Sequence, residues 1–587
     1  MTNWAALAAS HNVPPDDSTR YLAAAAHLDS SYADDAIREY LVEPTRPVPP
    51  SPGFHAPTVL AEAISARSRR KYRDALLGVL ALVFLYFSIG TALFSIWVFL
   101  AGLLSIRSIW KRMRTGRPGA ALRGFGSLFA LAVVLFFVTA FTFGGLFLED
   151  LGVSKYSSSS SGRYGDSYGS DYYGGGTTVS DPSLAYIGAI AAVVMLLILV
   201  ADRITVWRLL TVRYGRRARS RPFGGKSLDE RPSIAAAPPR FRTELERHRH
   251  DRQVHSGDGV VPLVVYRGYN PFVGAGVARQ SWSMVLPLEK LDETAKPDGT
   301  PFDELTTVAF YQRIRAAMQV LQRSDALTPD RRLRELRIQD VVYASADELV
   351  DHAHEPVALP YLPRHDGPPS YLLPAAEAEQ VRRQPREWAR HYLTFQVETW
   401  DRDLMMSAFL HAAVDSSTLY LEWTPYVLPP IRDEYRVVDR MTMNYLTAIG
   451  QGVLRWLKLP ATTPGRVWHA MRTIRAQPHD IDTPNPSRYG SAETLRELAA
   501  AEEVRDYFQL VDVERYEKIL ESRLVPAISQ VMRDCGYSAA QFERQAATVI
   551  NNDITITGTN NAPIVTGGVN QGTISGGTVQ QPRNEEK

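Results

Sequence analysis

Three long apolar segments constrain this chain more than any other feature of its sequence. They span Ala75–Ile106, Gly124–Leu148 and Leu184–Ala201, and none of them contains Asp, Glu, Lys, Arg or His. About 20 consecutive apolar residues are enough for one helix to cross the hydrocarbon core of a membrane. The pattern therefore predicts an integral, multi-pass membrane protein. The lack of ionisable groups at depth argues against an ion or proton pathway.

Basic residues gather beside these apolar segments and predict their orientation. The stretch from Arg107 to Arg123 holds six basic residues and the stretch from Arg203 to Lys226 holds eight, whereas 149–183 holds two beside five acids. By the positive-inside rule the two basic stretches are cytoplasmic and 149–183 is outside. The predicted localisation is the cell membrane, with the N- and C-terminal regions in the cytoplasm.

The first apolar segment is too long for a single ordinary span. Its 32 residues would extend about 48 Å at a rise of about 1.5 Å per residue. Both of its flanks are basic, so a helical hairpin that turns near Ser88–Thr91 would keep both flanks inside. One long span with the N-terminus outside is the competing interpretation.

The predicted fold class is a membrane α-helical segment followed by a cytosolic α+β domain and a Gly/Asn/Thr-rich, β-prone tail. The predicted parts are an N-terminal helical region (1–74), the membrane hairpin or long span (75–106), two transmembrane helices (124–148 and 184–201), an outside low-complexity loop rich in Ser, Tyr and Gly (149–183), a basic juxtamembrane linker (203–257), the α+β domain (258–548) and the tail (549–587). The loop at 149–183 is too poor in apolar residues to bury a core, so the sequence predicts a disordered region there.

Short apolar runs in 258–548 predict a mostly antiparallel sheet with helices to one side. Residues 259–266, 281–288 and 336–343 have the composition of strands, and 391–399, 404–413 and 418–427 form a meander with Asp-rich turns between them. Helical periodicity covers 302–323, 435–457 and 491–535. Such a mixture is typical of the α+β class.

The loop Gly268–Gly276 is the most distinctive candidate site in this domain. Its glycines lie between two strands, where backbone N–H groups can approach an anion, and Arg267 and Arg279 flank it. The candidate ligand-binding residues are therefore Arg267, Gly268, Gly274, Gly276 and Arg279. No other part of a kinase or dinucleotide-binding motif accompanies the loop, so a structural turn is the competing interpretation.

The basic arm after the last apolar segment offers a second candidate site. Its arginines could attract anionic membrane lipid; they are Arg208, Arg213, Arg216, Arg217 and Arg219. A topology signal without any further role is the alternative. The net charge of +2 gives no basis for a nucleic-acid partner, and the single cysteine, Cys535, excludes an intramolecular disulfide and a multi-cysteine metal site. No catalytic, metal or cofactor residues are assigned.

Three segments together carry a resemblance to a known group. The Arg20–Asp29 helix, the loop Tyr269–Gly276 and the segment Leu428–Arg432 resemble those of uncharacterised actinobacterial multi-pass membrane proteins, a group that implies no activity. Residues 550–581 are nearly free of charge and resemble the amyloid-type signalling motifs found at the ends of some bacterial immunity proteins. Asn, Gln, Thr and β-branched residues favour cross-β stacking; a binding tail and a disordered tail remain alternatives.

These features predict a membrane-anchored interaction, scaffold or signalling protein that contacts membrane lipid and an unknown protein partner, with self-association through the tail. The rival prediction is a ligand sensor or enzyme that binds an anionic small molecule at Gly268–Gly276. An enzyme is the less favoured class, because no catalytic arrangement can be assigned from the sequence.

Overall fold

The computed structural model describes residues 17–49, 54–88, 97, 101, 182–216, 238–251, 259–292, 300–323, 327–364, 367–474 and 485–551. The chain divides into two units, 1–539 and 540–587. In the second unit the described element is the helix α17 (Ala540–Asn551). The predicted tail, 549–587, lies almost entirely outside the described residues. All elements below belong to the first unit.

A helical group at the start of the chain packs around small side chains. Its elements are α2 (Asp17–Leu28), α3 (Ser30–Ile37), the π-helical turn η1 (Arg38–Val42), α4 (Ala56–Ser88), α7 (Pro182–Leu209), the π-helical turn η2 (Leu210–Tyr214) and α9 (Pro239–Asp251). The four alanines 23–26 of α2 are fully buried, and α2 packs against α4. Alanine lets the helix axes approach closely and favours the helical conformation. Asp29 starts α3 by accepting a hydrogen bond from the Ser31 amide at 2.8 Å.

This core also contains parts of the chain that are distant in sequence. Leu210 and Tyr214 of η2 and Phe241 and Leu245 of α9 are buried in it, although 203–257 was predicted to be a linker. Residues from the C-terminal half complete the same core: Ile431, Tyr435, Val438, Leu495 and Ala499. The N-terminal helices and the C-terminal half of the first unit are therefore one packed structure.

The prediction of a multi-pass membrane protein is wrong for the part of the chain that the structure describes. Within these residues a single helix, Tyr186–Tyr214, is long and apolar enough to cross a membrane. One such helix is weak evidence, so the multi-pass localisation at the cell membrane is not supported. The segment Gly124–Leu148 lies outside the described residues.

The apolar segment Ala75–Ile106 is described only in part. α4 carries it as a helix to Ser88, and the ring centroids of Phe84 and Trp97 lie 5.0 Å apart. One straight helix would separate these two residues by about 20 Å, so Phe84 and Trp97 do not lie on one straight helix. The predicted turn beyond Ser88 lies outside the described residues.

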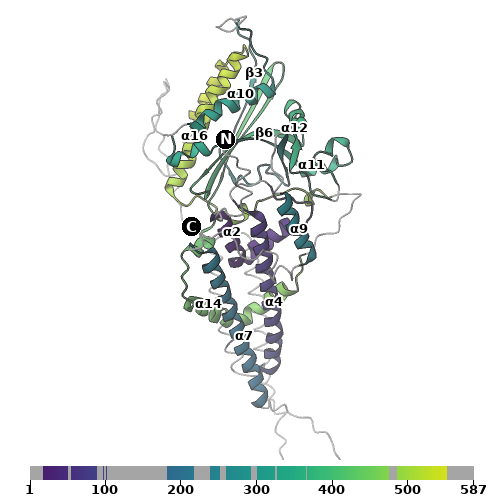
Figure 1. Cartoon of the computed structure of the whole chain (residues 1–587), viewed down its shortest axis with the longest axis vertical. Helices are drawn as coiled ribbons and strands as arrows, with labels where there is room; N and C mark the ends of the chain where they lie inside the picture. The colour runs from purple at the N-terminus through teal and green to yellow at the C-terminus, as the bar shows by residue number, and fades with distance from the viewer. Residues whose placement is uncertain are drawn as a thin grey trace, which may run out of the picture. The chain divides into compact units, whose positions relative to one another are not determined.

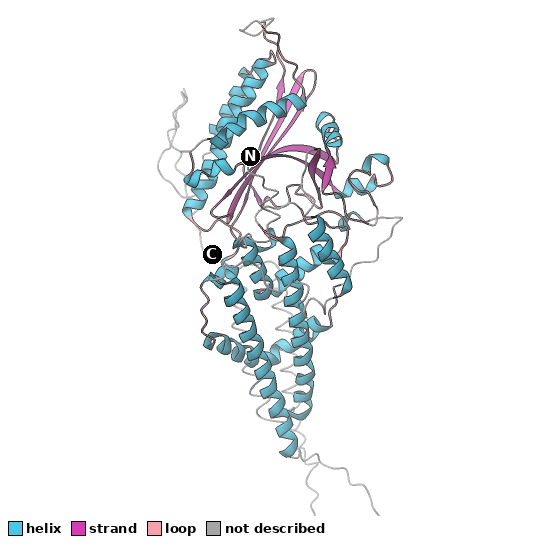
Figure 2. Ribbon diagram, in the orientation of Figure 1, coloured by secondary structure: helices cyan, strands magenta, loops and turns pink. Residues whose placement is uncertain are grey.

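The second half of the first unit is built on one sheet, as the α+β prediction required (Figure 2). Its strands are β1 (Val260–Tyr266), β2 (Val277–Ala278), β3 (Trp282–Pro287), β4 (Arg337–Ser345), β5 (Leu372–Pro374), β6 (Ala389–Thr399), β7 (Leu404–Val414) and β8 (Thr418–Leu428). Their order is β2-β8-β7-β6-β4-β1-β5, and β3 also pairs with β8. β1 and β4 are parallel, and the other pairs are antiparallel.

Helices cover one face of this sheet, on which α10 and α16 lie side by side (Figure 1). Other helices of this half, α13, α14 and α15, pack instead on the N-terminal helices. In chain order the helices and short helical turns of this half are α10 (Thr307–Gln319), η5 (Val320–Arg323), η6 (Pro329–Glu335), α11 (Ala346–Asp351), η7 (Pro356–Ala358), α12 (Ala375–Arg383), α13 (Asp433–Arg436), η8 (Val437–Asp439), α14 (Leu446–Leu457), α15 (Leu459–Met471), η9 (Pro486–Arg488), η10 (Glu497–Ala499) and α16 (Tyr507–Asp534). The loop Gly268–Gly276 covers the opposite face with Phe272, whose ring stacks on Phe409 at 4.0 Å.

Two helix predictions need correction. The predicted helix 435–457 is interrupted between η8 and α14, where Asp439 binds Arg20 and Tyr21 of α2 and the Asn444 side chain accepts from the Leu446 amide. The predicted helix 491–535 begins only at Tyr507, capped by Asp506, because the segment before it makes long-range contacts described below. Tertiary contacts override helical periodicity in both places.

A buried histidine under α10 and α12 makes the stability of the fold depend on pH. Nε2 of His391 lies 2.9 Å from Oδ1 of Asp340, and burial lowers the histidine pKa to about 4. Between the unfolded-state pKa of 6.5 and about 4, the unfolded chain binds the proton and the folded chain does not. The free energy of unfolding therefore falls as the pH drops through this window.

We expect the melting temperature of the full chain to fall between pH 7.5 and pH 5, and the fall to be smaller for His391→Gln. Glutamine can keep the hydrogen bond to Asp340 but does not titrate. Some of the fall remains, because burial also lowers the pKa of His27 and His411. The exposed His354→Gln is the matched control and should behave as the wild type. An equal fall in wild type and His391→Gln would contradict the assignment.

Candidate functional site

The loop Gly268–Gly276 holds a carboxylate of the chain itself. The Gly274 and Gly276 amides donate to the two oxygens of Glu497 at 2.9 and 3.0 Å. Thr494 adds two further donors to the same side chain, its amide at 2.7 Å and its hydroxyl at 3.0 Å. The loop therefore does bind an anion with its backbone, and η10 supplies that anion.

The loop needs its glycines to make this contact. Gly274 and Gly276 have φ values of 95° and 90°, in the left-handed region that side chains disfavour. A Cβ atom on Gly276 would lie 2.3 Å from the carbonyl oxygen of Val427. Gly268, at φ 87°, supplies a third such turn. Phe272 packs the middle of the loop on the sheet. This contact holds the Gly274 and Gly276 amides in place independently of Glu497.

Burial raises the pKa of Glu497, although its hydrogen bonds lower it. Desolvation of the charged form is therefore the larger effect. A buried carboxylate without these donors would be more costly still. The loop compensates much of the cost of burying this acid, and the acid in turn ties the loop to the segment 494–499.

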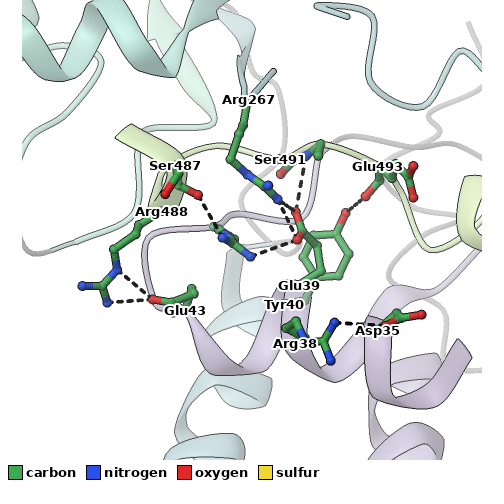
Figure 3. Close-up of polar contacts among 12 residues, drawn as sticks. Asp35, Arg38, Glu39, Tyr40, Glu43, Arg267, Ser487, Arg488, Ser491 and Glu493 are labelled. Atoms are coloured by element: carbon green, nitrogen blue, oxygen red, sulfur yellow. Dashed lines mark hydrogen bonds and ion pairs between the residues drawn. The ribbon is translucent and has the colours of Figure 1, made fainter. Parts of the chain in front are cut away.

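The two arginines beside the loop are also paired with acids of the chain. Arg267 at the end of β1 donates to both oxygens of Glu39 in η1, at 2.6 and 2.7 Å (Figure 3). Arg279 Nε lies 3.0 Å from Glu517 of α16. Of the five predicted ligand contacts, four thus meet an internal carboxylate: Arg267, Gly274, Gly276 and Arg279.

Glu39 belongs to a wider polar contact that joins η1 to the segment 487–493. Arg46 lies 3.0 Å from Glu39. Nη2 of Arg488 lies 2.7 Å from Glu43 (Figure 3). The hydroxyl of Tyr40 donates to the carbonyl of Glu493. Glu43 and Arg488 are both almost completely buried. Removing one member of a buried ion pair leaves an uncompensated charge, which typically costs about 3–5 kcal/mol.

Sequence reasoning missed Glu39, Glu43 and Glu497. Glu39 and Glu497 lie in short helical segments, and Glu43 directly follows one. Each also has a partner more than 200 positions away, which no local spacing rule can detect. The spacing of Thr494 and Glu497 is that of a capping box and could have indicated their local contact. The other available signal is the loop itself, whose glycines and flanking arginines correctly indicated an anion-binding backbone but not the source of the anion.

The predicted lipid-contacting residues are described in part. Arg208 and Arg216 are exposed, and Arg213 lies 3.9 Å from Glu62. Arg217 and Arg219 lie outside the described residues. Among the residues that the structure describes, no group of three His, Cys, Asp or Glu side chains is arranged to hold a metal ion.

We expect Glu497→Gln to lower the free energy of unfolding by about 1–3 kcal/mol, because the amide group places a donor against backbone N–H groups that need an acceptor. The melting temperature of the full chain measures this. Glu503→Gln, at an exposed position of the following segment, is the matched control and should leave it unchanged. Equal melting temperatures for both variants would show that Glu497 does not hold the loop.

Comparison with known families adds one match. The model of the AbeC-like domain matches residues 281–575, just over half of the chain. No curated protein and no solved structure matches this chain. The matched region contains Glu497, Arg488 and most of the sheet, whereas Glu39, β1 and the loop Gly268–Gly276 precede it.

Proposed function

We propose that this chain, which belongs to the AbeC-like domain family, is a membrane-anchored scaffold. In this proposal its α+β body binds a protein partner. The observation that carries the anchor is the set of apolar side chains exposed on neighbouring helices. α4 and α7 pack together through Leu77, Met195 and Leu199. Their outer surfaces expose Leu82, Tyr86, Tyr186, Ile190 and Leu197, each by 60% or more.

Exposed apolar area of this extent is unfavourable in water, at about 25 cal/mol per Å². The core helix of a soluble protein would be mostly buried, but the most apolar part of α7 is only 28% buried. A signal sequence would lie near the N-terminus, whereas the apolar span of this helix begins at Tyr186. Contact with lipid accounts for the exposure better than either alternative.

We expect the wild-type chain to remain in the membrane pellet after carbonate extraction, and Ile190→Asp with Leu197→Asp to move into the supernatant. A charge at the centre of a membrane helix costs about 2.5–3.5 kcal/mol on insertion scales. Both positions are exposed, so the substitutions create no buried charge in the folded body. Val285→Asp, exposed on β3, is the matched control and should stay in the pellet. Release of the wild type would refute the anchor.

The tail is the proposed interaction element of the scaffold. Its support is compositional: residues 550–581 are nearly uncharged and rich in Gly, Asn, Gln and Thr. The family match includes 549–575, so most of the tail belongs to the region that defines the family.

We expect the detergent-solubilised full chain to self-associate and bind thioflavin, and a chain that ends at Asn551 to do neither. Light scattering measures the size of both, and thioflavin fluorescence reports cross-β structure. Replacing residues 552–587 by a Gly/Ser segment of equal length controls for the loss of mass. Equal assembly of all three chains would exclude the tail as the interaction element.

The alternative of an anion sensor is less well supported. An external ligand would have to displace Glu497 from two amides and from Thr494, against four hydrogen bonds. A rise in the wild-type melting temperature with added pyrophosphate would favour the sensor over the scaffold.

A further inference from the structure

Five arginines converge where α4, α7, α14 and α15 meet. This arginine cluster consists of Arg69 and Arg73 of α4, Arg203 of α7, Arg455 of α14 and Arg466 of α15. Two aspartates lie among them: Asp202 is 2.8 Å from Arg73 and 3.5 Å from Arg69, and Asp74 is 2.7 Å from Arg73 and 3.1 Å from Arg466. His469 also contacts Asp74, at 3.3 Å. The cluster therefore has three more cations than anions.

Arg455 is the member of the cluster without an ion-pair contact, although Asp202 is close enough to favour its charged form. It has no hydrogen bond or ion pair with any of the residues that the structure describes, and it is only partly exposed. Burial and the repulsion of Arg203, Arg73 and Arg466 lower its pKa to about 9, far from the usual value of 12.5. A guanidinium is normally protonated under all conditions. A further anion beside Arg455 would favour its charged form.

Other donors of the cluster are also incompletely used. The Nε atom of Arg203 is buried without a hydrogen-bond acceptor, and the Nε atom of Arg69 has only the ion pair with Asp202 at 3.5 Å. Arg203 donates instead through its Nη2 to Gln451 of α14, which is neutral. Buried donors without an acceptor are rare and costly. Planar guanidinium groups match the oxygens of a phosphate in geometry as well as in charge.

The surroundings of the cluster indicate which kind of molecule could bring a phosphate group to these arginines. α14 packs its small residues Ala448 and Gly452 inward, and a Cβ atom on Gly452 would lie 2.8 Å from the Cα atom of Val200 in α7. Its other side exposes Leu446, Ile449 and Leu454. Figure 1 shows α14 lying across α7 rather than along it. An amphipathic helix with an exposed apolar side beside basic residues is typical of the membrane surface.

α15 continues the same surface. Trp468 and Met471 are each 65% exposed, and both follow Arg466 on this helix. The exposed apolar residues of α4 that lie beyond the cluster begin at Ala75 and Leu76, which follow Asp74. The arginine cluster thus lies between an apolar surface and the polar body of the protein. Lipid headgroups occupy the corresponding level of a membrane.

We propose that the arginine cluster is a binding site for the phosphate of an anionic phospholipid, whose acyl chains lie along the exposed apolar sides of α4 and α7. This inference rests on the proposed membrane anchor and adds a specific site to it. Arg455 and Arg203 supply free donors to the phosphate. Arg69, Arg73 and Arg466 supply charge while they remain paired with Asp202 and Asp74.

The test uses the full chain in an uncharged detergent with three probes: dioctanoyl phosphatidylglycerol, dioctanoyl phosphatidylcholine and inorganic phosphate. Phosphatidylglycerol should raise the melting temperature in a saturable manner, and the other two should not, because binding to the folded state alone stabilises it. In Arg455→Gln the half-saturating concentration should rise about tenfold, as expected for the loss of one charge-assisted contact. Without lipid, Arg455→Gln should melt at the same temperature as the wild type or higher, because repulsion is relieved.

Arg208→Gln, at an exposed position of the same helix as Arg203, is the matched control and should keep the wild-type affinity. If phosphatidylglycerol binds equally weakly to both variants, general surface charge and not a specific site attracts the lipid. If inorganic phosphate stabilises the chain as much as phosphatidylglycerol does, the site binds free phosphate and the proposal of a lipid ligand is wrong. If phosphatidylglycerol does not stabilise a chain that resists carbonate extraction, this inference fails and the anchor stands. If carbonate releases the chain, the anchor itself fails.

Discussion

The pairing of three glutamates, one buried and two half-buried, with donors far away in the sequence holds this structure together. Glu39 and Glu43 bind Arg267 and Arg488 and so connect the N-terminal helices to the rest of the first unit. Glu497 connects the loop Gly268–Gly276 to the segment 494–499. Each carboxylate is costly to bury alone and becomes favourable only when its partners are in place. The N-terminal helices, the sheet and the segment 485–500 therefore depend on one another for stability.

This dependence changes how the candidate site and the family match should be understood. A loop with the features of an anion receptor is occupied by a side chain of the same protein, so its present role is to connect structural elements. The match to the AbeC-like domain begins at residue 281, after β1 and the loop. β1 lies between β4 and β5 in the sheet, so the matched region uses preceding residues to complete its own core.

The sequence predicted what depends on local pattern. The strands of the meander, α2, α10 and the α+β class follow from alternation and helical periodicity, and the anion-binding backbone follows from Gly274 and Gly276. The partners Glu39, Glu497 and Arg455 could not be predicted, because their roles come from contacts across hundreds of residues. The predicted helix at 491–535 failed for the same reason: residues 491–499 bind β1, η1 and the loop instead. Apolar composition predicted several membrane crossings, of which the described residues contain one helix long and apolar enough.

Hydrogen exchange on the full chain with Glu43→Gln would test the mutual dependence most directly. We predict faster amide exchange in both 17–49 and 485–500, because the buried Arg488 loses its counter-charge and both sides of the contact loosen together. Asp35→Asn removes an exposed pair with Arg38 in the same helical segment and should leave both regions unchanged. Faster exchange in only one of the two regions would contradict the account.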